Sequence, residues 1–315
     1  TPSNFLAGTA ILNNDAIGIG CDWGTTTLRA YLLGRDAEIL EKIETPKGIM
    51  SVEDGDFQKV FEDIVGYWMD LFPTCPIVLS GMVGSRQGWV EAPYIECPVE
   101  INKLSNKLIT IELTRNREVF LVPGLTFIDE EGVPDVMRGE EVQILGACSG
   151  EPVKERLICL PGSHSKWVRL ADNDVKEFST YMTGEIYEAV RNNTILSKTL
   201  EPNAWSKKAF LSGVQYSRQN RNILSQLFHV RTQILFDKLS NRSSASFLSG
   251  LLIGHELKSA LQNSHNHEIY LIGERTLTQL YADAINEFGR TTKKATPDIV
   301  TLGYFTLLRQ LADRD

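Results

Sequence analysis

Apolar residues recur along the first half of the chain in two alternating patterns. Short apolar runs bounded by turn residues predict buried strands, and apolar positions three and four residues apart predict amphipathic helices. The strands predicted in this way span 17–21, 28–33, 38–44, 76–79 and 118–122, and the helices span 56–72 and 137–147. Strands that alternate with helices indicate an α/β fold.

The pattern then starts again. A strand, a hydroxyl-rich turn and a second strand are predicted in 156–170, as in 17–33, and a helix-rich region follows. The remaining predicted elements are helices at 182–192, 204–219, 223–235, 243–260, 277–288 and 302–312, and a strand at 268–273. We therefore expect two related lobes, 1–149 and 150–315, because Gly, Pro and charged residues cluster near 149–154.

The turn after the first strand carries candidate chemistry. Asp22 ends the strand, and Gly24, Thr25 and Thr26 follow it. Such a turn presents N–H groups and hydroxyls to an anion, and the acidic residue can hold a hydrated Mg²⁺ beside it. This suits the polyphosphate of a nucleotide, although an ordinary hairpin turn with locally bonded threonines is the alternative. On the outgoing strand, the Arg29 guanidinium could reach a sugar acid or a phosphate.

The turn in the second half repeats this chemistry. It reads Gly162, Ser163, His164, Ser165 and Lys166, with a glycine, two hydroxyls and a cation in close succession. Lys166 could be a solvated surface charge, but its place in a tight turn after an apolar strand favours phosphate contact. Two anion-binding turns, one from each lobe, predict a clamp for a triphosphate.

Carboxylates gather where the helix at 137–147 is predicted to begin. Asp135, at a loop–helix junction, could act as general base toward a substrate hydroxyl, or it could simply cap the helix. Arg138 and Glu140, with Glu141, form a charged cluster on an otherwise apolar helix. A solvated helix face is the alternative explanation of that cluster.

A flexible polar loop is predicted in 81–89, after the strand at 76–79. Loops at the carboxyl ends of strands bind ligands in open α/β sheets. Arg86 could bind a substrate carboxylate and Gln87 could read hydroxyls, with Ser85 and Trp89 beside them. The alternative is a surface loop with an incidental arginine.

Bulk properties exclude several classes of partner. The net charge of −8 and the pI near 5.3 argue against nucleic acid or an anionic membrane as the main partner. No apolar run is long enough for a transmembrane helix, and no secretory signal is evident, so a cytoplasmic location is expected. The 5 cysteines are odd in number and include no CxxC, which favours reduced, mostly buried thiols.

Six motifs together resemble the 2-keto-3-deoxygalactonokinases, which belong to the superfamily of acetate and sugar kinases, Hsp70 and actin. The resemblance extends from about residue 17 to residue 312. The motifs lie at 22–26, 81–89, 137–141, 161–167, 182–185 and 247–254. Their combination is far more specific than any single motif.

This resemblance implies two ribonuclease-H-like lobes with an ATP cleft between them. It implies ATP-dependent phosphorylation of 2-dehydro-3-deoxy-D-galactonate at the 6-hydroxyl, in galactonate breakdown, and it is compatible with a homodimer. Carried over by motif, Asp22 would orient Mg²⁺ and residues 24–26 would contact phosphate. Residues 162–165 would meet the β- and γ-phosphates, and Gly273 would stand at the adenosine.

The chain departs from the superfamily pattern in two loops. The second phosphate element is usually Asp-x-Gly-Thr but reads Pro-Gly-Ser-His in 161–164, and Glu274 replaces the second glycine of the adenosine element. Related sugar kinases place an aspartate before the helix, which favours Asp135 as the base, with Glu140 as its rival. Two functional alternatives stay open: a kinase for another sugar acid, such as 2-keto-3-deoxygluconate, and a non-kinase ATPase.

Overall fold

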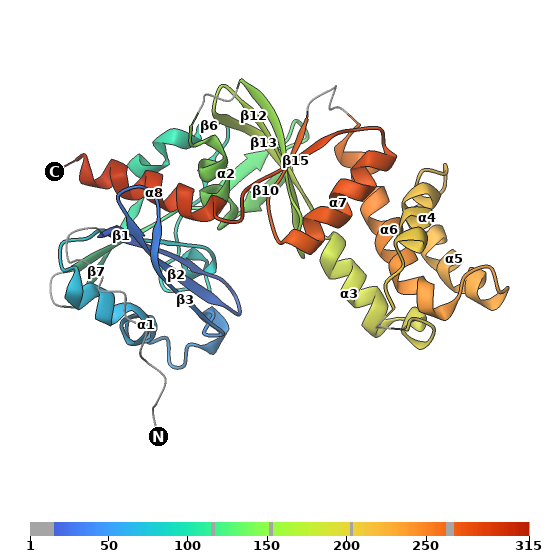
Figure 1. The fold of residues 1–315 in the computed structure, drawn as a ribbon, viewed down its shortest axis with the longest axis horizontal. Coiled ribbons are helices and arrows are strands. Elements are labelled where there is room, and N and C mark those ends of the chain that lie inside the picture. Colours follow the sequence, from blue (N-terminus) through green and yellow to red (C-terminus); the bar gives the residue numbers. More distant parts are fainter. Residues whose placement is uncertain (1–15, 115–116, 151–153, 202–203, 263–267, 315) are drawn as a thin grey trace. The chain divides into compact units, whose positions relative to one another are not determined.

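The computed structural model describes residues 16–114, 117–150, 154–201, 204–262 and 268–314 (Figure 1). The chain forms two compact units: unit 1 comprises Thr1–Pro152 and Asp298–Asp315, and unit 2 comprises Val153–Pro297. In the ranges that the structure describes, no helix has the length and apolar character needed to cross a membrane.

Unit 1 is built on a mixed sheet with the strand order β3-β2-β1-β4-β8-β7. Strands β1, β2 and β3 are antiparallel neighbours, whereas β4 runs parallel to β1 and β8 runs parallel to β4. A smaller sheet has the order β10-β9-β5. The strands are β1 (Ala16–Trp23), β2 (Leu28–Gly34), β3 (Ile39–Thr45), β4 (Ile77–Ser80), β5 (Ile95–Glu96), β6 (Val99–Glu100), β7 (Ile109–Leu113), β8 (Arg117–Leu121), β9 (Leu125–Ile128) and β10 (Pro134–Met137). The helices are α1 (Phe57–Leu71), α2 (Glu140–Cys148) and α8 (Ile299–Ala312), with short 3-10 turns at Ile49–Ser51, Met82–Gly84 and Ile101–Lys107.

Unit 2 repeats this topology. Its strands follow the order β15-β14-β11-β12-β13, with β11, β12 and β13 antiparallel and with β14 and β15 parallel to β11. This matches β8-β4-β1-β2-β3 strand for strand, so the predicted repetition is confirmed. The strands are β11 (Glu155–Leu160), β12 (Ser165–Ala171), β13 (Asp174–Tyr181), β14 (Ile269–Leu271) and β15 (Thr292–Lys294). The helices are α3 (Thr183–Asn193), α4 (Lys207–Ser217), α5 (Ile223–Leu235), α6 (Asn241–Ala260) and α7 (Arg275–Glu287), with a 3-10 turn at Ile195–Lys198.

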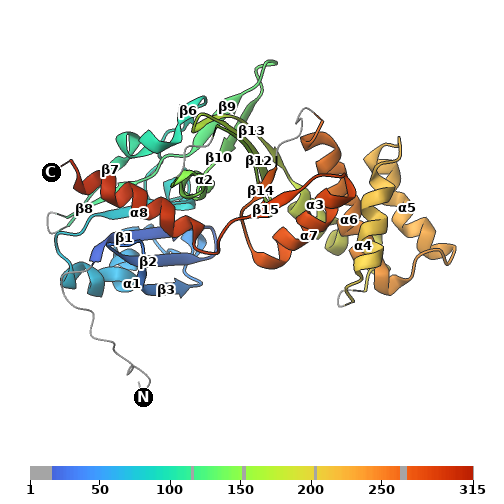
Figure 2. The same ribbon diagram turned by 45° about the horizontal axis from the view of Figure 1, so that its top comes forward.

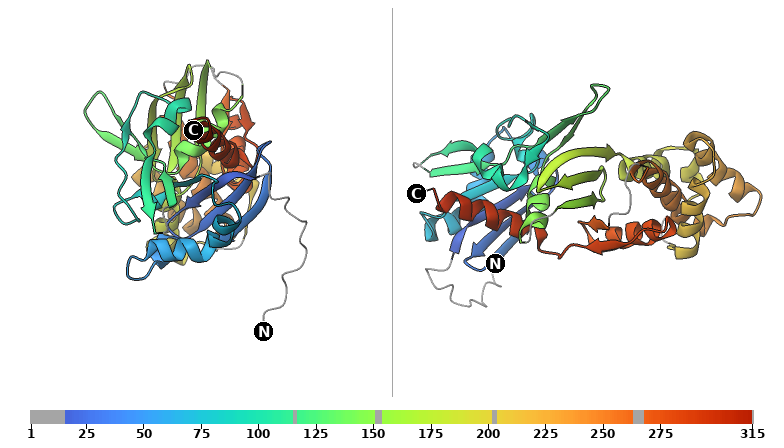
Figure 3. Two further views of the ribbon diagram at one scale, coloured as in Figure 1. Left: turned by 90° about the vertical axis from the view of Figure 1, so that its left-hand side faces the viewer. Right: turned by 90° about the horizontal axis from the view of Figure 1, so that it is seen from above.

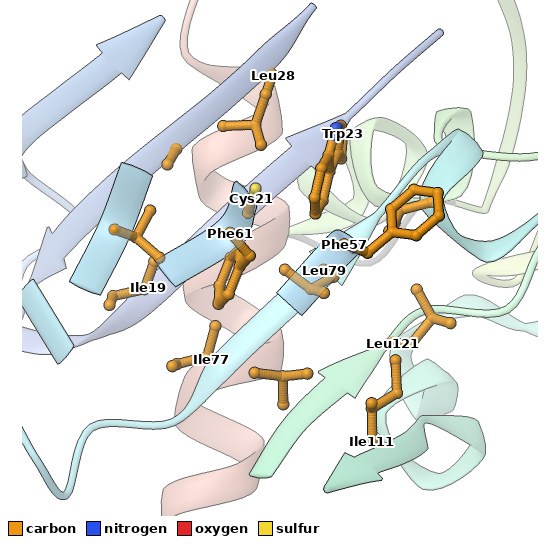
Figure 4. Packing of buried hydrophobic residues seen from close by; sticks show 14 of the residues in the cluster. Ile19, Cys21, Trp23, Leu28, Phe57, Phe61, Ile77, Leu79, Ile111 and Leu121 are labelled. Atoms are coloured by element: carbon orange, nitrogen blue, oxygen red, sulfur yellow. The ribbon is translucent and has the colours of Figure 1, made fainter. Parts of the chain in front are cut away.

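Strand β1 is buried on both faces because its alternate residues meet different helices. Ile19 and Cys21 belong to the apolar core that α1 covers (Figure 4). Gly18 and Gly20 face α8 on the opposite side, and Figure 2 shows the two helices on opposite faces of the sheet. A Cβ on Gly20 would lie 2.3 Å from Cγ of Tyr304, so α8 can approach this closely only over glycine.

A second helical layer covers unit 2. Helices α4, α5 and α6 form a cluster, coloured yellow to orange in Figure 3. Glycines make the closest approach possible, because a Cβ on Gly250 of α6 would lie 1.9 Å from the carbonyl oxygen of Phe210 in α4. A Cβ on Gly254 would lie 2.2 Å from Oγ of Ser217, so both glycines serve helix packing.

The cysteines are free thiols, as predicted. Cys75 is half-buried, and the buried ones are Cys21, Cys97, Cys148 and Cys159. Burial raises the pKa of Cys97 to about 12, so this thiol stays protonated and unreactive at neutral pH. Among the residues described, no three or more His, Cys, Asp or Glu side chains are grouped so as to hold a metal ion.

Two features of the α2 region correct the sequence analysis. The predicted helix 137–147 starts only at Glu140, because the residues before it form β10, which pairs with β9. Asp135 therefore lies in a strand and does not cap the helix; Gly139, with φ of +107°, is the residue before its first turn. The predicted loop at 81–89 contains a 3-10 turn and is anchored by hydrogen bonds, so it is compact.

The last helix corrects the predicted lobe of 150–315. The division between the units falls at Pro152 and Val153, but α8 returns to unit 1. It packs on α2, where a Cβ on Gly303 would lie 2.0 Å from the carbonyl oxygen of Val142. Strands β13 and β15 are absent from the prediction because each carries few apolar residues.

The α2–α8 contact predicts a large stability effect at Gly146. A Cβ there would lie 1.9 Å from the backbone carbonyl oxygen of Ile299, so Gly146→Ala must push the two helices apart. We expect a loss of about 3 kcal/mol in the free energy of unfolding, at the upper end for overpacking. Urea unfolding followed by circular dichroism measures it. The matched control is Gly66→Ala in α1, where the nearest atom, Cβ of Glu62, is 4.0 Å away. That change should stabilise by about 0.5–1 kcal/mol, and equal effects of the two changes would contradict the packing argument.

Candidate active site

Three segments of unit 1 meet at the carboxyl end of its sheet. Asp22 lies near the end of β1, Gly81 follows β4, and Gly139 precedes α2. A Cβ on Gly81 would lie 3.0 Å from Oδ1 of Asp22, and a Cβ on Gly139 would lie 3.3 Å from Cα of Gly81. Both glycines have positive φ, +92° and +107°, which favours glycine at these turns. The edge where ligands bind in α/β sheets is thus formed by a carboxylate and two bare backbone turns.

Asp22 has an unusual electrostatic environment. Burial raises the pKa of this carboxyl group to about 6; the charge of Glu140 adds to the rise, and Arg29 opposes it. Nη1 of Arg29 is 3.8 Å from Oδ2 of Asp22, while its Nε donates to Oε1 of Glu44 at 2.9 Å. Arg29 is therefore held by two carboxylates. The shifted pKa places Asp22 among candidate functional groups.

The turn that follows β1 is held by hydrogen bonds from the 3-10 turn at Ile49–Ser51. Its carbonyl oxygens accept from Ile49 and Met50, with 3.0 Å from Ile49 N to Gly24 O and 3.2 Å from Met50 N to Thr25 O. Thr25 and Thr26 are exposed. The carbonyl groups of Gly24 and Thr25 are thus engaged inside the protein, whereas the side chains of Thr25 and Thr26 are exposed.

Two glutamates occupy the first turn of α2. Oε2 of Glu140 accepts from the backbone N–H of Arg138 at 3.0 Å, and Oε2 of Glu141 accepts from that of Gly139 at 2.7 Å. Glu141 is fully buried, and burial together with the charge of Glu140 raises its pKa to about 8. The sequence analysis included Glu141 only in a charged cluster and assigned it no role. Burial distinguishes Glu141 from the half-buried Glu140, and burial is visible only in the structure.

The Arg138 side chain reaches back under the 81–94 region. Its Nη2 donates to the carbonyl oxygen of Ala92 at 2.8 Å, and its guanidinium lies 4.4 Å from the ring centroid of Tyr94. A Cβ on Gly84 would come within 3.0 Å of Nη1. Nε and Nη1 are buried and have no hydrogen-bond partner in the described part of the chain. Through its contacts with Ala92 and Tyr94, the Arg138 side chain holds this segment in place.

The predicted substrate residues of the segment 81–89 differ in exposure: two are exposed and two are half-buried. Arg86 and Gln87 are exposed, and Nε of Arg86 lies 3.6 Å from Oε1 of Glu91. Oγ of Ser85 donates to the carbonyl oxygen of Met82 at 2.7 Å, which stabilises the turn itself. Trp89 packs into the core: its ring is stacked on Phe57, with 6.5 Å between the centroids.

The two candidate bases lie in different surroundings. Asp135 is half-buried on β10, opposite Phe127, and its Oδ1 accepts from the N–H of Val136 at 2.7 Å. Glu140, in contrast, is the carboxylate whose charge raises the pKa of Asp22. Glu140 thus lies within electrostatic reach of Asp22, whereas Asp135 lies on β10 of the smaller sheet β10-β9-β5.

The first turn of α3 packs against the turn between β11 and β12 and forms a hydrogen bond to it. The backbone N–H of Glu185 donates to the carbonyl oxygen of Ser163 at 3.1 Å, and its side chain pairs with His164. A Cβ on Gly184 would lie 2.6 Å from the carbonyl oxygen of Gly162. Ser163 and His164 are themselves exposed, as the prediction of a ligand-facing turn requires.

Ser165 and Lys166 correct the predicted extent of this turn. Both belong to β12 and are buried, because the strand begins two residues earlier than predicted. Oγ of Ser165 lies 2.8 Å from the hydroxyl of Tyr281, and Nζ of Lys166 donates to Oγ1 of Thr180 at 2.8 Å. The Lys166 ammonium is therefore not a solvated surface charge.

Gly273 lies beside this turn. It follows β14 with φ of +147°, and a Cβ on it would lie 3.5 Å from the carbonyl oxygen of Pro161. Glu274, the departure from the superfamily pattern, caps α7: its carboxylate accepts from the N–H groups of Thr276 and Leu277, at 2.9 Å each. These hydrogen bonds lower the pKa of Glu274. By topology, Gly273 in unit 2 corresponds to Gly81 in unit 1.

Two ribonuclease-H-like units, each with an exposed hydroxyl-bearing turn between its first two strands, define the class of this protein. It has the fold of the actin-like superfamily of ATPases and sugar kinases. A crystal structure of (R)-2-hydroxyglutaryl-CoA dehydratase component A from Acidaminococcus fermentans shares this fold, with a TM-score of 0.50 and 12% identity over 94% of this chain and 98% of that one.

The particular family follows from sequence comparison. The profile of the 2-keto-3-deoxy-galactonokinase family matches residues 22–307, and the chain belongs to this family. It is 34% identical to a probable 2-dehydro-3-deoxygalactonokinase of Rhizobium meliloti (strain 1021), over 88% of this chain and 91% of that relative. It is 33% identical to the 2-dehydro-3-deoxygalactonokinase of Escherichia coli (strain K12), over 86% and 90%. A crystal structure from Sinorhizobium meliloti, of a protein assigned to the same activity, superposes with a TM-score of 0.85 at 32% identity, over 94% of this chain and 99% of that chain.

Proposed function

We propose that this chain transfers the γ-phosphoryl group of ATP to the 6-hydroxyl of 2-dehydro-3-deoxy-D-galactonate. The observation that carries the proposal is its membership of this kinase family across residues 22–307. Two relatives support the substrate: a 2-dehydro-3-deoxygalactonokinase at 33% identity and a probable 2-dehydro-3-deoxygalactonokinase at 34% identity. A kinase of this family uses ATP, and no observation favours the non-kinase ATPase.

Magnesium would be held at Asp22. Mg²⁺ is usually bound through one or two carboxylates together with substrate phosphates and waters, so a complete cage of protein ligands is not needed. A half-buried carboxylate with a pKa of about 6 suits this role, since a cation would favour its charged form. When bound, the ion would supply neutralisation of phosphate charge.

The nucleotide would be bound through the two turns and Gly273. We propose that Gly24, Thr25 and Thr26 contact phosphate from unit 1, and that residues 162–164 do so from unit 2. Ser165 and Lys166 would act mainly by fixing the start of β12, because their side chains are engaged inside the unit. Gly273 would leave room for the adenosine, with no Cβ beside Pro161.

Phosphoryl transfer needs a group that orients the attacking hydroxyl, and we propose Glu140. It lies at the amino end of α2 and interacts with Asp22, so it would stand close to the reacting phosphate. Asp135 is the second candidate. Arg138 would position this region through the carbonyl group of Ala92 and the ring of Tyr94. Positioning and charge neutralisation supply most of the rate in such reactions.

The sugar acid would be bound by the exposed part of the 81–89 segment and by Arg29. Arg86 would pair with the substrate carboxylate, in exchange for its long contact with Glu91. Gln87 would read a hydroxyl. Ser85 and Trp89 would shape this surface through the turn and the core beneath it.

The assembly and its location stay predictions. A homodimer is compatible with the sequence. The net charge of −8 argues against nucleic acid or an anionic membrane as a partner, and a cytoplasmic location is part of the proposal.

A coupled kinase assay with parallel substrates tests the proposed function. We expect ADP formation that depends strictly on 2-dehydro-3-deoxy-D-galactonate and on Mg²⁺, with kcat/KM at least tenfold lower for 2-keto-3-deoxygluconate. A preference for the gluconate-derived acid would move the substrate to the other stereoisomer. ATP hydrolysis that ignores both acids would favour the ATPase alternative.

A further inference from the structure

Unit 2 contains a buried carboxylate that the proposed reaction does not use. Glu256 of α6 is 3% exposed. Its Oε1 accepts from Nε1 of Trp167 at 2.7 Å. Its Oε2 accepts from the hydroxyl of Tyr281 at 2.7 Å and from the hydroxyl of Thr183. One side chain thus joins strand β12, the start of α3 and helix α7.

All of these donors are neutral. In the part of the chain that the structure describes, Glu256 forms no ion pair with a lysine or an arginine within 4.0 Å. A charge buried without a counter-ion is costly unless hydrogen bonds satisfy it, and its burial raises the pKa of Glu256. The carboxylate is therefore held by several hydrogen bonds that must all be in place, which makes it a rigid junction.

The segments that Glu256 joins are the ones that hold the turn at 161–164. Thr183 is followed directly by Gly184, whose Cα packs on Gly162 and Ser163, and by Glu185, whose N–H binds the carbonyl oxygen of Ser163 at 3.1 Å. At the other end of the turn, Ser165 lies 2.8 Å from the same Tyr281 hydroxyl that donates to Glu256. Both ends of the turn are thus tied to one carboxylate.

We propose that Glu256 is a positioning residue for ATP: it fixes the backbone of the turn at 161–164 through Thr183 on one side and Tyr281 on the other. This rests on the proposed function only in assigning that turn to the nucleotide phosphates. Glu256 itself touches no phosphate. Its loss should weaken nucleotide binding and leave binding of the sugar acid intact.

Glu256→Gln is the sharpest test, because the amide keeps the size of the side chain. With the amide oxygen toward Trp167, the amide nitrogen must donate to the hydroxyls of Thr183 and Tyr281, which have to turn round and accept. The hydrogen bonds that a carboxylate accepts from both sides of the turn are then replaced by weaker bonds between neutral groups. We expect KM for ATP and the Kd of ADP, measured by calorimetry without sugar acid, to rise at least tenfold. KM for the sugar acid should change less than twofold.

Thr183 provides a conservative rescue. Thr183→Ser keeps the hydroxyl and should bind ADP like the wild type, whereas Thr183→Val should behave like Glu256→Gln. The double variant Glu256→Gln/Thr183→Val should be no worse than the poorer single variant, because both remove one interaction.

Gln226→Met is the matched structural control. Gln226 is also fully buried in unit 2 and hydrogen-bonded, to the carbonyl oxygen of Tyr216 and to His255, but it lies in the helical cluster and not at the turn. The Gln226→Met substitution should lower the Tm without changing the Kd of ADP.

Three outcomes separate the possibilities. Unchanged ADP affinity in a folded Glu256→Gln would overturn the positioning role. Equal losses toward ADP and sugar acid, matched by Gln226→Met at a similar Tm, would reduce Glu256 to a general structural residue. A wild-type protein that binds ADP, with the expected variant effects, but phosphorylates neither acid would support the positioning role and overturn the proposed function instead.

Discussion

Replacing Glu140 by glutamine is expected to lower kcat about 10²–10⁴-fold, the range for losing a general acid–base group. The amide keeps the size of the side chain and can still accept from the N–H of Arg138, so α2 should keep its start. It cannot take a proton from the substrate hydroxyl. Loss of its charge should also lower the pKa of Asp22, because that charge contributes to the rise. Steady-state kinetics, with calorimetric titration of ADP, measure the effect.

Asp135→Asn is the matched comparison for this prediction. Asp135 belongs to β10 and accepts a hydrogen bond from the next backbone N–H, so its amide variant should fold normally. We expect kcat to fall less than tenfold. If Asp135→Asn abolishes transfer and Glu140→Gln does not, the base is Asp135 and Glu140 serves only the start of the helix.

Gly184→Ala is expected to raise KM for ATP about 10²-fold. The new Cβ would lie 2.6 Å from the carbonyl oxygen of Gly162 and 2.8 Å from Cα of Ser163, both backbone atoms that cannot rotate away. The turn must shift by a few tenths of an ångström to about 1 Å, and misplacement by 1 Å can cost 10²-fold in catalysis. Initial rates at varied ATP and at saturating sugar acid measure the change.

The control for this prediction is Gly66→Ala, the same substitution in the open surroundings of α1. It should leave both KM values within twofold of the wild type. A Gly184→Ala protein with normal KM for ATP would show that the turn tolerates displacement, and would remove it from the nucleotide site.

The spacing of apolar residues along the chain was sufficient to predict the long helices. Helix α5 begins and ends where the apolar spacing predicts, and α1 differs by one residue at each end, because an amphipathic helix carries its own period along the chain. The repeated strand–turn–strand motif was readable for the same reason. The short strands β5, β6, β9 and β10 were not, since each spans only two to four residues and is too short to show a period.

For the candidate site, residue type and position beside a strand were enough to propose Asp22, Thr25, Ser163 and Gly273. The burial of each polar side chain, however, could not be predicted from the sequence. It separates the exposed Arg86 from the braced Arg138, draws Ser165 and Lys166 into β12, and reveals Glu141 and Glu256. A buried glutamate and a solvated glutamate look alike in a sequence, because the difference lies in what packs around them.

The sequence by itself determined the repeated α/β units, the two hydroxyl-bearing turns and the family, because these reside in local periodicity and in contiguous motifs. Only the tertiary structure decided that α8 returns to unit 1, that the charge of Glu140 raises the pKa of Asp22, and that Glu256 accepts hydrogen bonds from both Thr183 and Tyr281. Those facts depend on contacts between residues far apart along the chain, which close packing sets and local patterns do not encode.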